Sequence, residues 1–273
     1  MTNDLGAPAP SRGRLLAARA VAVVAALFWG VLFFGLVDLA TVVLQDERFA
    51  RHYLVEAGWG LLYTGLAMLP LLAWAVRPRA TVLLQGVLVT GAAVALAGLV
   101  AGAFGQLLPA LGLAASALVP AALARQDLRP ARVTPRAVHP VLAGLALAGL
   151  GGAVAYAVAV LRAAAAGEPD DETWGLQHLP MQAGLGLALA ACALAVAVVR
   201  AGGTARWRAG VVPPALVAVS LGACSVLYPE HLASLGTVGG VACAAWGAAL
   251  GACGVLVPDA RVLGRDAPAT PRR

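Results

Sequence analysis

Two similar segments carry most of the residues in this chain that could bind a ligand or transfer a proton. One begins at residue 46 and reads DERFARHYLVEAGWGL, and the other begins at residue 171 and reads DETWGLQHLPMQAGLGL. Each contains a histidine followed four residues later by an acid or its amide, and these pairs are His52 with Glu56 and His178 with Gln182. Residues four apart share a helix face and imidazole titrates near neutral pH, so each pair is a candidate ligand or proton site.

A single acid within an apolar run is a further candidate. Asp38 lies in FFGLVDLATVV, near the outer end of the first predicted helix. A carboxylate is costly in hydrocarbon, so this side chain should face other helices and be either paired or protonated. Arg162, expected at a similar depth in the fifth predicted helix, is the partner that the sequence suggests. Such a pair would be either a structural link or part of a ligand or proton site.

Three histidines, His52, His178 and His231, are expected at the outer membrane boundary. If the helix ends converge, their imidazoles and the neighbouring carboxylates could hold a divalent transition metal or haem iron. No H-x-x-x-H or C-x-x-C spacing fixes such a site, however. The sequence therefore favours the simpler interpretation, in which each histidine is a half-solvated side chain that hydrogen-bonds a loop carbonyl.

The elements that must position these residues are membrane helices. The chain is 61% hydrophobic and 12% charged, with a mean hydropathy of +0.85, whereas soluble domains carry about 25% charged residues. Its apolar runs are long and continuous rather than short and alternating, which excludes a strand barrel and predicts an all-α integral membrane protein. Eight transmembrane helices are expected over residues 17–43, 54–76, 80–103, 106–124, 138–163, 180–200, 209–227 and 235–257.

The similarity of the two segments predicts two tandem four-helix repeats. A second pair of corners agrees with this spacing, because Arg77-Pro-Arg79 in the first half has a counterpart in Arg206-Trp-Arg208 in the second. A repeat with an even number of spans keeps both copies in the same orientation. The expected organisation is a cytoplasmic tail (1–14), repeat 1 (15–124), a basic cytoplasmic linker (125–137), repeat 2 (138–257) and a second cytoplasmic tail (258–273).

The distribution of charge predicts the orientation. If the N-terminus is cytoplasmic and eight helices alternate, the inner segments hold 16 of the 19 arginines and only four of the 13 acids. This is the positive-inside pattern, with both termini in the cytoplasm. All basic residues are arginine and alanine is abundant, as in a GC-rich genome, so we expect a bacterial inner (plasma) membrane protein. The basic charge then faces the bilayer and its anionic lipids, and no nucleic-acid partner is needed.

The sequence leaves three functions open. The first is binding or transport of a small solute, lipid or proton between the two halves, near Asp38, His52, Glu56 and His178. The second is a membrane haem, metal or redox protein that uses the outer histidines, and the third is a non-catalytic membrane scaffold. No Walker A, G-x-S-x-G or H-E-x-x-H motif is present, so the sequence favours binding or transport over enzymatic catalysis.

Overall fold

The computed structural model describes residues 10–45, 47–128, 138–201 and 206–258, and these are almost entirely helical. Most of both predicted tails and residues 129–137 of the predicted linker lie outside the described residues. In chain order the elements are α1 (Arg12–Leu27), η1 (Phe28–Leu32), α2 (Gly35–Leu44), η2 (Glu47–Phe49), α3 (Tyr53–Gly60), η3 (Leu61–Met68), α4 (Leu69–Val76), α5 (Thr81–Ala101), η4 (Phe104–Gln106), α6 (Leu107–Leu123), α7 (Pro140–Ala165), β1 (Glu172–Thr173), β2 (Leu176–Gln177), α8 (His178–Ala201), η6 (Trp207–Gly210), α9 (Val212–Leu227) and α10 (Gly236–Leu256).

Eight helical segments within the described residues are long and apolar enough to cross a membrane. We number them spans 1 to 8, and they consist of α1–η1–α2, α3–η3–α4, α5, η4–α6, α7, α8, η6–α9 and α10. The prediction of eight long apolar helices is therefore confirmed. Large side chains such as those of Leu108, Leu147 and Val238 are exposed around the outside of the bundle, as expected for surfaces that face lipid.

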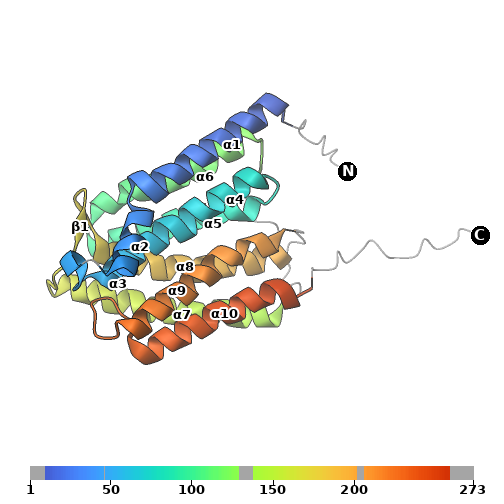
Figure 1. Cartoon of the computed structure of the whole chain (residues 1–273). Helices are drawn as coiled ribbons and strands as arrows, with labels where there is room; N and C mark the ends of the chain where they lie inside the picture. The colour runs from blue at the N-terminus through green and yellow to red at the C-terminus, as the bar shows by residue number, and fades with distance from the viewer. Residues whose placement is uncertain (1–9, 46, 129–137, 202–205, 259–273) are drawn as a thin grey trace, which may run out of the picture.

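The eight spans run side by side, so the bundle has two distinct ends (Figure 1). The start of α1 and the end of α10 lie at one end, whereas α2, α3 and the β1–β2 hairpin gather at the other. In the first half, spans 1, 2, 3 and 4 contact one another in a ring, and spans 5, 6, 7 and 8 do the same in the second half. Spans 2 and 3 of the first half pack against spans 6 and 7 of the second. The central span is α8, most of which is buried.

Span 1 is interrupted, although its sequence predicts one helix over residues 17–43. A π-helical stretch, η1, ends at Leu32, and Phe34 then takes a left-handed conformation with φ of 64°. The helix resumes as α2, which places Asp38 in the first turn of a new helix. The positive end of the helix dipole favours negative charge at this position.

Spans 1 and 2 approach closely beside this break. A Cβ atom on Gly35 would lie 2.9 Å from the hydroxyl oxygen of Thr64 in span 2, and one on Gly60 would lie 2.8 Å from the backbone oxygen of Gly35 in span 1. Only glycine leaves room for the two backbones here. Aromatic rings fill the space alongside, with Trp29 stacked on Tyr63 at 5.2 Å between ring centroids. The beginning of α2 is thus held against span 2.

Candidate functional site

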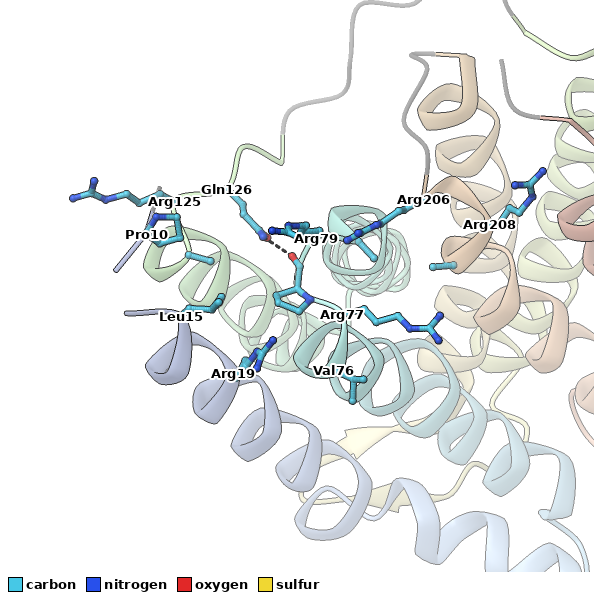
Figure 2. A pocket seen from close by; sticks show the side chains of 14 residues that line it. Pro10, Leu15, Arg19, Val76, Arg77, Arg79, Arg125, Gln126, Arg206 and Arg208 are labelled. Atoms are coloured by element: carbon cyan, nitrogen blue, oxygen red, sulfur yellow. Dashed lines mark hydrogen bonds between the residues drawn. The ribbon is translucent and has the colours of Figure 1, made fainter. Parts of the chain in front are cut away.

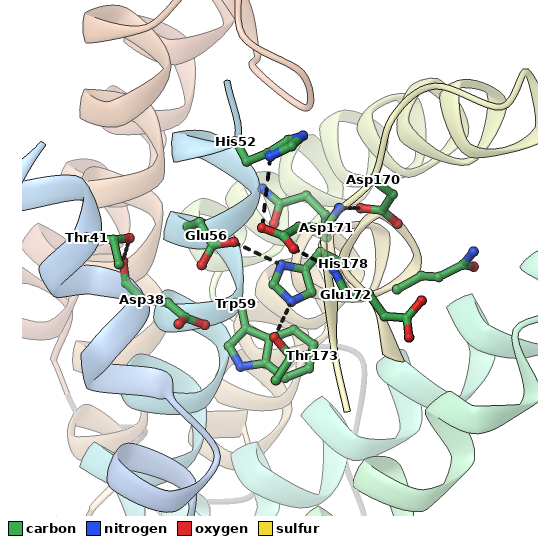
Figure 3. Close-up of polar contacts among 12 residues, drawn as sticks. Asp38, Thr41, His52, Glu56, Trp59, Asp170, Asp171, Glu172, Thr173 and His178 are labelled. Carbon is green, nitrogen blue, oxygen red and sulfur yellow. Dashed lines mark hydrogen bonds and ion pairs between the residues drawn. The ribbon is translucent and has the colours of Figure 1, made fainter. Parts of the chain in front are cut away.

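Five ionisable side chains meet at the end of the bundle that carries the β1–β2 hairpin (Figure 3). Asp38 comes from α2, His52 and Glu56 from the start of α3, Asp171 from the loop before β1, and His178 from the first turn of α8. We call this group the acid–histidine cluster. Four of its members were singled out in the sequence, and both halves of the chain contribute to it.

The members of the cluster are linked from the bundle interior to its surface. The Glu56 carboxyl group hydrogen-bonds the carboxyl groups of both Asp38 and Asp171. Its Oε1 atom lies 3.6 Å from Nδ1 of His178, and Oδ2 of Asp171 lies 3.9 Å from Nδ1 of His52. Two carboxyl groups can hydrogen-bond only when one of them carries a proton. The cluster thus forms a continuous row of groups along which a proton can be shared, from the buried acids to half-exposed His52.

Packing on both sides fixes the imidazole of His178. The ring is 1% exposed and stacks on Trp59, with 4.3 Å between ring centroids. Its Nε2 atom lies 2.9 Å from the Thr173 hydroxyl, whose donor or acceptor role depends on the tautomer of the histidine. These contacts turn Nδ1 toward Glu56, where it can accept or deliver a proton.

The loop before α8 holds the second half of the cluster in place. The carboxylate of Asp170 accepts hydrogen bonds from the backbone N–H groups of Leu179, at 3.0 Å, and Asp171. Partial burial raises the pKa of Asp170, although these N–H donors oppose the rise. Burial alone would also raise the pKa of Asp171, but hydrogen bonds from Glu56 and the Glu172 backbone, together with the nearby histidines, hold it below its usual value. Asp171 is thus the ionised member at the surface.

A cavity of about 550 Å³ opens beside the cluster. Asp38 lines it and is 6% exposed, and its Oδ2 atom has no hydrogen-bond partner. The aromatic rings of Phe34 and Trp174 form part of the wall. The described residues that line the cavity include one arginine, Arg48, and four acids, which are Asp38, Glu56, Asp171 and Glu172. The cavity thus joins an acidic lining to apolar and aromatic surface.

Gln182, which the sequence pairs with His178, links helices instead of joining the cluster. Its amide nitrogen donates to the Tyr156 hydroxyl at 2.7 Å and to the backbone oxygen of Leu54 at 3.2 Å. The amide lies directly over Gly58, where any Cβ atom would collide with it. Gln182 therefore joins α3, α7 and α8 through a fully buried polar contact.

Two other predicted site residues lie away from the cluster. Arg162 is exposed on α7, and no ion pair among the described residues joins it to Asp38, whose acidic neighbours are Glu56 and Asp171. The expected Asp38–Arg162 pair is therefore not formed. His231 instead stacks on Tyr53, with 5.9 Å between ring centroids. The sequence paired Asp38 with Arg162 because both were expected at a similar depth in the membrane. This criterion failed because Asp38 faces span 2 rather than span 5.

The three histidines of the predicted metal site are not gathered into one ligand set. His52 and His178 belong to the cluster, whereas His231 is held among tyrosines. Across residues 10–45, 47–128, 138–201 and 206–258, no group of three or more His, Cys, Asp or Glu side chains is arranged to hold a metal ion. The predicted set of His52, His178 and His231 is therefore not brought together in the described structure.

Three residues of the cluster and its surroundings, Asp171, Trp59 and Thr173, were not predicted from the sequence as site residues. Asp171 stands in the similar segment itself, and its position at a loop between apolar runs was the available signal. Trp59 lies three residues after Glu56, on nearly the same helix face, so it could have been included. No sequence pattern indicated Thr173, because its contact with His178 forms only when the β1–β2 hairpin folds back.

Comparison of the chain with protein-family models, with curated proteins and with solved structures finds no match. The chemistry of the acid–histidine cluster is thus the basis for inferring function. The buried Asp38 and the acid-lined cavity are its most informative features.

Proposed function

We propose that this chain is a multi-pass membrane protein that binds a small cationic solute at the acid–histidine cluster in exchange for a proton. The observation that carries the proposal is the buried Asp38 carboxyl, hydrogen-bonded to Glu56 on one side and open to the cavity on the other. Ionisable residues at membrane depth are expensive to keep and typically mark ion or proton pathways.

The lining of the cavity suits a cation. Four acids and one arginine give it an excess of negative charge, which attracts cations and disfavours anions. The faces of Phe34 and Trp174 offer a second attraction, since aromatic rings bind organic cations such as ammonium groups. A volume of about 550 Å³ lies within the ordinary range for small-molecule sites.

The hydrogen-bonded carboxyls suggest how binding is coupled to protons. The proton shared by Glu56 with Asp38 and Asp171 keeps these acids from repelling one another. A bound cation would supply that positive charge instead, so the proton would leave toward half-exposed His52. The broken helix supports this role, because transporters often bind ions where a membrane helix is interrupted.

In this proposal the cluster lies on the outer side of the membrane. The charge pattern supports this orientation, because most arginines among the described residues lie at the opposite end of the bundle, and the positive-inside rule assigns such an end to the cytoplasm. With eight spans, both termini would then be cytoplasmic, in a bacterial inner membrane. The ring of four spans in each half supports duplication, and the cluster lies where the two halves meet.

The test uses purified full-length protein in detergent or nanodiscs. Thermal melting is measured with a panel of small amines and quaternary ammonium compounds across about pH 5 to 8, and proton release is followed with a pH dye in weak buffer. We expect at least one cation to raise the melting temperature, more strongly at higher pH, with release of a proton. Asp38→Asn should abolish both signals.

Glu230→Gln is the matched control, because Glu230 is an exposed acid outside the lining of the cavity. It should respond like the wild type. If no cation raises the melting temperature, or if Asp38→Asn releases the same proton as the wild type, the proposal fails and a scaffold role gains support. An absorbance spectrum with a haem band, or stoichiometric metal, would instead support the redox alternative.

A further inference from the structure

A second cavity, of about 1010 Å³, opens at the end of the bundle opposite the acid–histidine cluster (Figure 2). Two Arg-x-Arg corners converge on it, one between α4 and α5 and the other at the start of η6. The described residues that line it include no acid and six arginines, namely Arg19, Arg77, Arg79, Arg125, Arg206 and Arg208. We call this the arginine pocket.

Hydrogen bonds hold the backbone segments that surround the arginine pocket. Gln126 donates a hydrogen bond from its amide to the backbone oxygen of Pro78 and accepts one from the indole of buried Trp74, at 3.2 Å. Gln85 donates to the backbone oxygen of Leu128 at 3.1 Å. These bonds tie the segment after α6 to the corner between α4 and α5, so the arginines project from a fixed backbone.

The charged side chains among the described lining residues are all positive. Figure 2 shows Arg19, Arg79 and Arg206, from three different elements, directed toward the same space. The Nε atom of Arg19 is buried and has no hydrogen-bond partner. Guanidinium groups that face one space repel one another, and an anion between them would offset this repulsion.

One arginine of the set has a structural role. Arg208 donates to the backbone oxygen of Val257 at 3.1 Å and lies over the Trp207 ring, with 5.4 Å from its guanidinium carbon to the ring centroid. It fixes the second corner against the end of α10. Arg125 turns its guanidinium away from the others in Figure 2. The groups left to hold a ligand are those of Arg19, Arg79 and Arg206, because the side chain of Arg77 also extends away from them in Figure 2.

We propose that the arginine pocket binds an anion that carries two phosphate groups. Guanidinium groups form paired hydrogen bonds to phosphate oxygens, and several arginines together match more than one phosphate. The ligand could be a diphosphate lipid headgroup, whose acyl chains would lie against apolar Leu15 and Val76 at the rim, or a soluble diphosphate. The inference is independent of the cation site, which lies at the other end of the bundle.

The experiment separates the two sources of phosphate. Full-length protein is delipidated and placed in nanodiscs of phosphatidylcholine alone, or of phosphatidylcholine with cardiolipin, and inorganic pyrophosphate is titrated into the first preparation. We expect saturable binding and a higher melting temperature in one arm. A response to cardiolipin alone identifies a lipid headgroup, and a response to pyrophosphate alone identifies a soluble ligand.

The variant Arg79→Gln/Arg206→Gln should weaken binding by about tenfold or more, because it removes two facing guanidinium groups. Arg162→Gln, which removes an exposed arginine outside the pocket, is the control and should bind like the wild type. Arg206→Gln alone replaces the double variant if the latter does not fold, since Arg206 is exposed. Absence of saturable binding in both arms, or equal binding by the variant and the control, would overturn the proposal.

Discussion

The two similar segments begin alike but serve different purposes. In the first, Glu56 joins a chain of carboxyl groups and faces His178 of the second segment. In the second, Gln182 at the matching position makes only neutral hydrogen bonds, to Tyr156 and to the backbone of Leu54. Glu56 carries a carboxyl oxygen where Gln182 carries an amide nitrogen, and this one difference separates a titratable group from an amide that can only make neutral hydrogen bonds.

The histidines differ in the same way. His178 is buried and stacked on an indole, whereas the side chain of His52 is 24% exposed and contacts Asp171 at the surface. Each histidine has an acidic neighbour from the other segment rather than from its own. The difference shows that burial and crossing helix ends, rather than the shared sequence pattern, set the surroundings of each histidine.

The largest expected effect comes from making the second segment acidic. Gln182→Glu would remove the amide donor and place a carboxylate against the backbone oxygen of Leu54, in a fully buried position. We expect a loss of roughly 3 kcal/mol or more in the free energy of unfolding, because the charge would be buried without a partner. Denaturant titration in micelles measures this loss.

Gln45→Glu is the control for that change, since Gln45 is exposed at the same end of the bundle. It should alter the free energy of unfolding by less than about 0.5 kcal/mol. Equal stability of the two variants would contradict the assigned difference between the segments.

The converse change, Glu56→Gln, makes the first segment resemble the second. An amide can still donate hydrogen bonds to Asp38 and Asp171, so we expect the melting temperature to change little. The carried proton would be lost, and proton release on cation binding should fall to background. Dye-based proton counting with a melting curve tests both statements, and unchanged proton release would exclude Glu56 as the carrier.

The histidines provide a smaller contrast. His178→Asn should reduce the free energy of unfolding by about 2 kcal/mol, because it removes a stacked ring from a buried site. His52→Asn should change it by less than about 0.5 kcal/mol, since that side chain is half-exposed. Similar losses for both variants would show that burial does not separate their roles.

The smallest effect concerns acid pH. The pKa of Asp171 is lowered from 3.8 in the folded state, so the unfolded chain binds the proton more readily. The stability that Asp171 contributes is therefore fully present above about pH 4 and is lost as the pH falls below 3.8. The stabilities of the wild type and Asp171→Asn, measured from melting curves, should differ by about 1 kcal/mol at most at pH 6. The difference should shrink as the pH falls below 3.8.

The sequence was informative about the helices and about one end of the bundle. Continuous apolar runs predicted eight long helices, since lipid leaves few other ways to satisfy the backbone. The position of polar residues near the ends of apolar runs indicated four site residues, and all four meet in one cluster, namely Asp38, His52, Glu56 and His178.

The contacts between these residues could not be predicted in the same way. The four-residue spacing suggested that His52 and Glu56 act as a pair, but helix starts from both halves cross, so Glu56 faces His178. The break at Phe34 carries no proline as a marker, and only close packing at Gly35 and Gly60 accounts for it. Such features depend on long-range packing, which local periodicity does not encode.

The proposed exchange of a proton for a cation at the acid–histidine cluster has an electrical consequence. Moving one elementary charge across a membrane potential of about 100 mV involves about 2.3 kcal/mol. If a monovalent cation takes the place of that proton, the net charge of the site stays constant. Occupancy would then respond to the ratio of cation to proton concentrations outside the cell and would be nearly indifferent to voltage.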